Sequence, residues 1–242
     1  YGIRQNFNAI VLAPNHVALP VPVLKTAKAQ GISLVLMDSN INCDCHDSFI
    51  ASDNYKAGQK AARYAASLLR GGGRLVLARH LENHASTHER ERGFLETIAS
   101  EAPHMTVVAD PYAGSSVGSA YRIITNLIAD SPPPDAIVAV GEEATLGSLR
   151  ALKEKGLERK IKLIGFDFNT TIRNAILNHE MTATIMQNPY QMGYRGVKAA
   201  RDLIQGKTVA ARIHTDTTVI TAENYPTAEV QNIIESNTPL TE

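Results

Sequence analysis

The residues that follow the short apolar runs of this 242-residue chain are mostly polar. They are Pro14-Asn15, Asp38-Ser39, Arg79-His80, Asp110, Gly141-Glu142, Asp167 and Gln187. Carboxylates, amides and a guanidinium exchange hydrogen bonds with hydroxyl groups, and the set holds no strong nucleophile. A glycoside hydrolase needs two acids around the bond that it cleaves, and Asp110 and Asp167 could be such a pair. With no nucleophile, phosphate loop or metal set beside them, the pattern favours a non-enzymatic site for a neutral polyol, without a cofactor.

Two cysteines and a histidine lie within the stretch Cys43-Asp44-Cys45-His46-Asp47. Thiolates and an imidazole are the ligands of a soft metal ion such as zinc. No second cysteine pair completes a tetrahedral set, so the alternatives are a disulfide across one residue or two free thiols in a loop. Oxidation of the pair fits an exported protein.

Three histidines recur at intervals of four residues, at His80, His84 and His88. If this stretch were helical, His84 and His88 could share a metal ion, but the sequence contains no HExxH pattern. The residues from Asn83 to Ser86 are typical of a loop that enters a helix. We therefore expect a solvated loop here rather than a metal site.

Two motifs that suggest enzyme loops have simpler explanations. The glycines at 71–73 lie after a helical segment and before an apolar run. A phosphate-binding loop has the opposite order, so this pattern predicts that the glycines end the helix. Ser115 and Ser116 precede another helical segment without the GxSxG pattern of a nucleophile, so one of them is expected to be an N-cap.

The elements that must position these residues alternate along the chain. Short runs rich in Val, Ile and Leu are AIVLA (9–13), SLVLM (33–37), RLVLA (74–78), TVVA (106–109), AIVAV (136–140), KLIGF (162–166), ATIM (183–186) and TTVI (217–220). Their length and continuous apolar character predict strands of a parallel sheet covered on both faces. Helical segments lie between them, two of which are expected to end at Gly31 and Gly156. The order predicts a doubly wound α/β fold, in which ligands bind beyond the carboxyl ends of the strands.

The composition excludes several classes of protein. The chain has 24 basic and 24 acidic residues, so nothing indicates a broad nucleic-acid-binding surface. No apolar run approaches the ~20 residues that a membrane-spanning helix needs. The sequence as given does not open with a signal peptide, but a removed signal peptide would leave no trace, so export stays open. With 44% apolar residues and two cysteines, the chain is expected neither to be disordered nor to be a disulfide scaffold.

Six stretches in a fixed order carry a resemblance to a known family. They are ASDNYKAG (51–58), RERGF (90–94), AVGEEATLGSLRAL (139–152), LIGFDFN (163–169), ATIMQNPYQMGYRGVKAA (183–200) and TTVITAEN (217–224). Together they resemble the periplasmic sugar-binding proteins of the ribose-binding type, which share their fold with the effector domains of lactose-repressor-type regulators. The resemblance spans nearly the whole chain.

The resemblance implies a periplasmic-binding-protein fold of type I, with two doubly wound, Rossmann-like lobes and three crossovers in the hinge. By analogy, one lobe comprises residues 1–52 and 188–215, and the other comprises residues 53–187 and 216–242. It implies a bacterial periplasmic protein that binds a small sugar or polyol between the lobes and delivers it to the membrane permease of an ABC importer. The alternatives are a module that presents the ligand to a membrane sensor, or the effector domain of a transcription regulator.

The resemblance also implies site residues. Arg90 matches an arginine that donates to sugar hydroxyls, and Asp167 matches a carboxylate that accepts from two of them. Phe166 is expected to pack on the sugar ring. Gln187 matches a glutamine beside the hinge, and Asp38 matches the carboxylate of the first lobe.

The sequence departs from the ribose-binding pattern at two places. Ser39 stands where the family has an arginine, and Gly141-Glu142 stands where it has Asn-Asp. A buried hydroxyl left without a partner costs about 1–3 kcal/mol, so the ligand is not expected to be restricted to ribose. Tyr112 or Tyr190 is a candidate for additional stacking.

Family members begin with a strand, a helix and a second strand before the segment that matches 1–14. The resemblance therefore implies that the first lobe of this chain is incomplete at its start. From this we expect a stable second lobe beside a first lobe that is loosened, swapped with a neighbour or completed by a separate segment, and we expect the isolated chain to bind sugar weakly.

Overall fold

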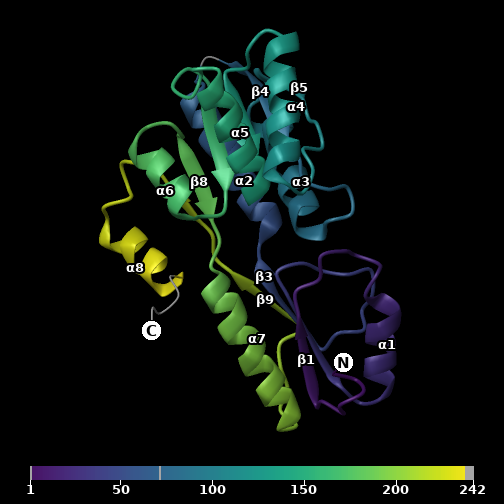
Figure 1. The fold of residues 1–242 in the computed structure, drawn as a ribbon. Helices are drawn as coiled ribbons and strands as arrows, with labels where there is room; N and C mark the ends of the chain where they lie inside the picture. Colours follow the sequence, from purple (N-terminus) through teal and green to yellow (C-terminus); the bar gives the residue numbers. More distant parts are fainter. Residues whose placement is uncertain (1, 71, 238–242) are drawn as a thin grey trace.

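Two separate sheets with flanking helices form the computed structural model, which describes residues 2–70 and 72–237 (Figure 1). One sheet has the strand order β1-β2-β3-β9, and the other has the order β10-β8-β7-β6-β4-β5. We call the part built on the first sheet the first lobe and the part built on the second sheet the second lobe. The predicted α/β fold with two Rossmann-like lobes is confirmed.

The first lobe has helices on both faces of its sheet. Its elements are β1 (Ala9–Leu12), α1 (Val21–Ala29), β2 (Ser33–Met37), β3 (Ser48–Ser52), α7 (Pro189–Ile204) and β9 (Arg212–Thr215). In β2, Leu34 and Leu36 pack on the side of α1, whereas Val35 between them packs on the side of α7. Since successive side chains of a strand point to opposite faces, a strand covered on both faces is apolar throughout.

The second lobe repeats this arrangement with more strands. Its strands are β4 (Gly73–Ala78), β5 (Met105–Ala109), β6 (Ala136–Ala139), β7 (Lys162–Phe166), β8 (Ala183–Met186) and β10 (Thr218–Ile220). Its helices are α2 (Asn54–Leu68), α3 (Ala85–Glu101), α4 (Val117–Asp130), α5 (Glu142–Glu154), α6 (Thr170–Leu177) and α8 (Ala228–Asn237). Along β4, Leu75 and Leu77 pack with the residues of α2 and α3, whereas Val76 and Ala78 pack with those of α4 and α5. Among the helices of residues 2–70 and 72–237, none has the length and hydropathy needed to cross a membrane.

The chain passes from one sheet to the other at three places. These passages follow β3, β8 and β9, and they lead into α2, α7 and β10 (Figure 1). Two of the strands beside them, β3 and β9, were not among the apolar runs that predicted strands. SFIAS and RIHT hold too few consecutive Val, Ile and Leu residues to stand out, and they become strands because β3 pairs with β2 and β9 pairs with β3.

Three local predictions can be compared with the structure directly. The strand β10 runs antiparallel to β8, so the second sheet is not purely parallel. The helix α2 ends at Leu68, before the glycines at 71–73, and Gly73 already belongs to β4. The C-cap residue of α2 is Leu69, so the predicted cap is not at Gly72 or Gly73, and the part of the prediction that concerns Gly71 lies outside the described residues. Ser116 caps α4 as expected, since its side chain accepts a hydrogen bond from the backbone N–H of Ser119.

The strand β1 is expected to exchange its amide hydrogens faster than β6. Among the described strands it lies at the edge of its sheet and pairs with β2 alone, and all four of its residues are half-buried. By contrast, β6 lies between β4 and β7, and its four residues are buried. Since exchange follows local opening, we expect at least a ~10-fold difference between residues 9–12 and 136–139 in hydrogen-exchange mass spectrometry. Equal protection of the two strands would contradict this prediction.

Candidate functional site

A cleft of about 370 Å³ lies between the two lobes. Its lining residues are Asn15, Asp38, His80, Leu81, His84, Ser86, Thr87, Arg90, Ser115, Gly141, Glu142, Glu143, Asp167 and Gln187. Two of these follow strands of the first lobe, and the others follow strands of the second lobe or begin its helices. Larger spaces of about 600 and 450 Å³ open beside the cleft and share Asp38 with it. A ligand in the cleft would therefore contact both lobes.

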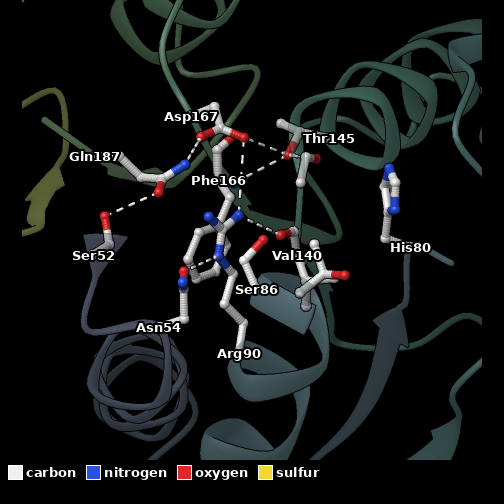
Figure 2. A network of polar contacts seen from close by, with 12 residues as sticks. Ser52, Asn54, His80, Ser86, Arg90, Val140, Thr145, Phe166, Asp167 and Gln187 are labelled. Atoms are coloured by element: carbon white, nitrogen blue, oxygen red, sulfur yellow. Dashed lines mark hydrogen bonds and ion pairs between the residues drawn. The ribbon is translucent and has the colours of Figure 1, made fainter. Parts of the chain in front are cut away.

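Arg90 is held rigidly in the wall of the cleft. It lies on α3, and only 3% of its surface is exposed. Its Nε donates to Oδ1 of Asn54 at 2.8 Å, its Nη1 donates to the carbonyl oxygen of Val140 at 2.8 Å, and its guanidinium lies 4.7 Å from the ring centre of Phe166 (Figure 2). Among the described residues, no acceptor pairs with Nη2, so this nitrogen is the donor that remains for a ligand. A planar, preoriented guanidinium suits the recognition of adjacent hydroxyl oxygens.

Asp167 and Gln187 form a chain of hydrogen bonds that reaches the first lobe. Gln187 Nε2 donates to Oδ1 of Asp167 at 2.6 Å, and Gln187 Oε1 accepts from the hydroxyl of Ser52 at 2.9 Å (Figure 2). The second carboxylate oxygen of Asp167 lies 4.0 Å from Nη1 of Arg90, which is the outer limit of an ion pair. Oδ2 of Asp167 therefore keeps its capacity to accept from ligand hydroxyls, while Oδ1 is oriented by the amide of Gln187.

Two carboxylates of the cleft lie on backbone of the same unusual conformation. Asp38 has φ +63° and Asp167 has φ +69°, both in the left-handed region. Asp38 follows β2 and Asp167 follows β7, so each lies where its strand ends. Aspartate tolerates this region better than most residues, and strained backbone of this kind gathers at binding sites. The conformation turns the chain sharply at the strand end.

Comparison with known proteins places this geometry in a family. Residues 2–208 match the model of the periplasmic binding protein domain. The chain belongs to this family. It is 28% identical to the ribose import binding protein of Bacillus subtilis over 211 residues, which cover 87% of this chain and 68% of that protein. The chain thus spans about two thirds of the length of this relative, and 64% of the ribose import binding protein of Salmonella typhimurium.

Solved structures support the same assignment. The periplasmic component of an ABC-type sugar transport system from Hahella chejuensis is 32% identical, with a TM-score of 0.87 and coverage of 91% of this chain and 81% of that one. A solute-binding protein of an ABC transporter from Agrobacterium vitis, bound to α-D-tagatopyranose, is 26% identical with a TM-score of 0.91, and the coverage is 96% and 80%. These relatives and solved structures are described as binding components of sugar import or ABC transport systems.

In this periplasmic binding protein, six of the nine residues named from the sequence line the cleft. These six are Asp38, Arg90, Gly141, Glu142, Asp167 and Gln187. Gly141 and Glu142 begin α5, and Oε1 of Glu142 accepts from the side chain of Asn169 at 2.7 Å. The strand-end argument also found Asn15 and His80, because the carboxyl ends of neighbouring parallel strands meet at one edge of the sheet.

The other three residues are not among those that line the cleft. Ser39 is buried, with 2% of its surface exposed. Tyr112 is exposed outside the cleft and stacks on Arg79, whose guanidinium lies 4.1 Å from its ring centre. Phe166 is fully buried beneath Arg90, so the guanidinium rather than a sugar packs on its ring. Asp110 pairs with Arg79 at 3.3 Å and does not line the cleft with Asp167.

The prediction of a solvated histidine loop is wrong in part. His88 is exposed, but only 9% of the surface of His80 is exposed, and His84 is half-buried. The ring centres of His80 and His84 lie 5.0 Å apart. Burial lowers the pKa of both imidazoles below the ordinary value. Spacing did not reveal this, because His80 follows β4 whereas His84 is the N-cap residue of α3, and the turn between them brings the rings together.

The cysteine motif and the alternative Tyr190 lie elsewhere. Cys43 and Cys45 form a disulfide that packs against the core of the first lobe on the side of α1. Among the described residues, no group of three or more His, Cys, Asp and Glu side chains could hold a metal ion. Tyr190 is exposed on α7 and stacks with Tyr194. None of these residues lines the cleft.

Sequence reasoning missed two side chains that hold the site, Asn54 and Ser52. Asn54 begins α2 and accepts from Arg90, while Ser52 ends β3 and donates to Gln187. Both belong to the stretch ASDNYKAG that carried the family resemblance. The resemblance therefore marked the segment, but neither residue type nor spacing indicated these partners.

Ser52→Ala is expected to weaken sugar binding about threefold, because one neutral hydrogen bond contributes about 0.5–1.5 kcal/mol. The substitution removes the donor that orients Gln187 from the first lobe. Isothermal titration calorimetry with a sugar that the wild-type protein binds measures the affinity of the variant. Ser67→Ala, which removes an exposed hydroxyl bonded to the carbonyl of Tyr64, is the matched control and should bind normally. Unchanged affinity of Ser52→Ala would mean that this bond does not act on the site.

Proposed function

We propose that this protein captures a small neutral sugar or polyol in the cleft between its lobes and delivers it to the permease of an ABC importer. The proposal places the protein in the bacterial periplasm. It takes residues 1–52 with 188–215 as one lobe and residues 53–187 with 216–242 as the other, with the sugar contacting both. The observation that carries it is the meeting of Asp38 from the first lobe with Arg90, Asp167 and Gln187 from the second in one cleft.

The chemistry of the cleft suits hydroxyl groups. Arg90 supplies a donor, Asp38 and Asp167 supply acceptors, and Gln187 can do both. A polyol presents hydroxyls that each donate and accept, so such a set can satisfy several of them together. The volume of about 370 Å³ lies in the range of small-molecule pockets, about 300–1,000 Å³.

Capture requires that the ligand favour the closed arrangement of the lobes. A ligand shifts such an equilibrium only by the difference in its affinity for the two states. Contacts to Asp38 on one lobe and to Arg90 and Asp167 on the other provide that difference. An importer can then distinguish the loaded protein from the empty one by its closed shape.

The proposal is tested in two steps. A thermal-shift screen with ribose, tagatose, other aldopentoses and hexoses, and inositols should identify a sugar that raises Tm, since a ligand that binds only the folded state stabilises it. Small-angle scattering with that sugar should show a smaller radius of gyration. If no sugar or polyol in the panel stabilises the protein, the proposed ligand class is wrong. Uptake of the radiolabelled sugar into proteoliposomes that hold the permease then tests delivery.

A further inference from the structure

His80 lies beside Gly141 at the cleft wall. A Cβ atom built on Gly141 would lie 3.6 Å from Cδ2 of His80 and 4.0 Å from Cγ2 of Thr87. Both distances are ordinary van der Waals contacts, so Gly141 packs directly beside the imidazole at the cleft wall. Gly141 is also one of the residues at which the sequence departs from the ribose-binding pattern. This departure therefore lies next to His80 in the structure.

The backbone and ring of His80 are held in place from several sides. Its N–H donates to Oε1 of Glu91 at 3.4 Å, and Glu91 in turn pairs with Arg79 at 2.9 Å. Its carbonyl oxygen accepts from the N–H of Gly114 at 3.2 Å. The ring of His84 packs against its ring at 5.0 Å, and Nδ1 of His84 lies 3.2 and 3.3 Å from the hydroxyls of Ser86 and Thr87. A ring fixed in this way is preorganised to bind rather than free to move.

The polar edges of His80 are not equivalent. Nδ1 is buried and has no hydrogen-bond partner among the described residues. Nε2 faces Glu143, which also lines the cleft. Nε2 lies 3.7 Å from Oε2 of Glu143, which is longer than a direct hydrogen bond. The imidazole and the carboxylate therefore face each other at the cleft, each with unused hydrogen-bonding capacity.

We propose that His80 and Glu143 form a specificity-determining pair that binds one hydroxyl group of a neutral sugar, with His84 positioning the imidazole. A hydroxyl oxygen accepts from Nε2–H of His80 while its hydrogen is donated to the carboxylate of Glu143. This inference rests on the proposed function, because it concerns the same cleft and the same class of ligand.

The pair selects a hydroxyl over an anion. A carboxylate or phosphate group accepts hydrogen bonds but, when ionised, cannot donate one to Glu143. The cleft also contains Asp38, Glu142 and Asp167, and Arg90 already lies beside Asp167. Since like charges repel in a partly desolvated site, sugar acids and sugar phosphates are disfavoured.

The experiment compares a bound sugar with its deoxy analogues. Calorimetry measures the affinity of the wild-type protein for the best sugar of the panel and for analogues that each lack one hydroxyl. One of these analogues should bind about tenfold more weakly than the sugar itself. Glu143→Ala and His80→Leu should each bind the sugar more weakly and lose the preference over that analogue. The side chain of Glu143 is 42% exposed, so its removal leaves the fold intact even if His80→Leu does not fold. The exposed His104→Gln variant is the control.

The outcomes separate this inference from the proposed function. If the wild-type protein binds no sugar, both fail. If it binds a sugar and Glu143→Ala keeps the wild-type preference among the analogues, only the assignment of the pair fails. Tight binding of gluconate by the wild-type protein would also overturn the inference.

The pH dependence of sugar affinity distinguishes a binding role of His80 from a purely structural role. Glu143, Arg90, Glu91 and Asp167 act on His80, while His80, Asp38, Arg90 and Glu143 act on His84. Burial lowers the pKa of His80, so the free protein holds it neutral at pH 7. Protonation below that pKa lets the imidazolium pair directly with Glu143 and displaces the hydroxyl. Wild-type affinity should therefore stay constant above the ordinary imidazole pKa of about 6.5 and fall once the pH drops below the lowered pKa of His80, and the profile of His80→Leu should be flatter.

Discussion

Asp167→Asn is expected to lower affinity for the cognate sugar at least tenfold without unfolding the protein. The substitution removes the charge that strengthens hydrogen bonds from ligand hydroxyls, and such bonds to charged groups contribute about 1.5–3 kcal/mol each. It also leaves the buried guanidinium of Arg90 without its only nearby carboxylate among the described residues, at 4.0 Å. Asparagine is the suitable replacement because it accepts the left-handed backbone at φ +69° as readily as aspartate.

Calorimetry measures the loss, and the Tm of the unliganded variant shows whether the fold is intact. Asp167→Ala should bind equally weakly but also lower Tm, because alanine is strained at this backbone conformation. The exposed Asp130→Asn at the end of α4 changes the same charge away from the cleft and should bind normally. Wild-type affinity in Asp167→Asn would remove this carboxylate from the binding site.

The sequence predicted the strand-end residues well because the argument depends on topology rather than on contacts. Once β2, β4, β6, β7 and β8 were predicted as parallel strands, Asp38, His80, Gly141, Asp167 and Gln187 had to emerge at the same edges of their sheets. The structure brings these residues to one cleft although they are far apart in the chain.

Cleft residues could not be distinguished from their neighbours at the same strand ends on the sequence alone. Asp38 lines the cleft and the adjacent Ser39 does not, because the positive φ of Asp38 turns the chain at that point. Likewise Asp167 lines the cleft while Phe166 faces the core beneath Arg90. Adjacent residues at a strand end point in different directions, and their direction depends on backbone angles that residue type alone does not determine.

Residues that hold the site through contacts between distant segments were the hardest to predict from the sequence. Asn54, Ser52 and the carbonyl of Val140 contribute to the site only because α2, β3 and β6 approach α3 and β8 in the folded protein. His80 likewise packs beside Gly141, some sixty positions later in the sequence. These contacts join segments that are far apart in the sequence, so the residue pattern within any one segment does not predict them.

Gly58→Ala is expected to destabilise the second lobe strongly. A Cβ atom at Gly58 on α2 would lie 2.0 Å from the carbonyl oxygen of Arg90 on α3. The contact is reciprocal, since a Cβ atom at Gly93 on α3 would lie 2.1 Å from the carbonyl oxygen of Tyr55 on α2. Both obstacles are backbone, so the helices must separate to admit a methyl group. Overpacking of this kind costs about 1–3 kcal/mol and occasionally more, and we expect the upper end here.

The separation would also reach the site. Arg90 and Asn54 lie next to the point where the two helices meet, and the hydrogen bond between them at 2.8 Å spans that contact. Loss of ~3 kcal/mol in a chain of this length lowers Tm by roughly 6–12 °C, which a thermal melt measures, and sugar affinity should fall with it. Gly118→Ala is the matched control, because Gly118 lies on α4 with no heavy atom within 4 Å of the added Cβ, and alanine favours a helix by up to ~1 kcal/mol. If the Tm of Gly58→Ala is no lower than that of Gly118→Ala, the two helices are not packed as closely as the structure indicates. In that case the position of Arg90 is held by its hydrogen bonds and not by the packing of α2 on α3.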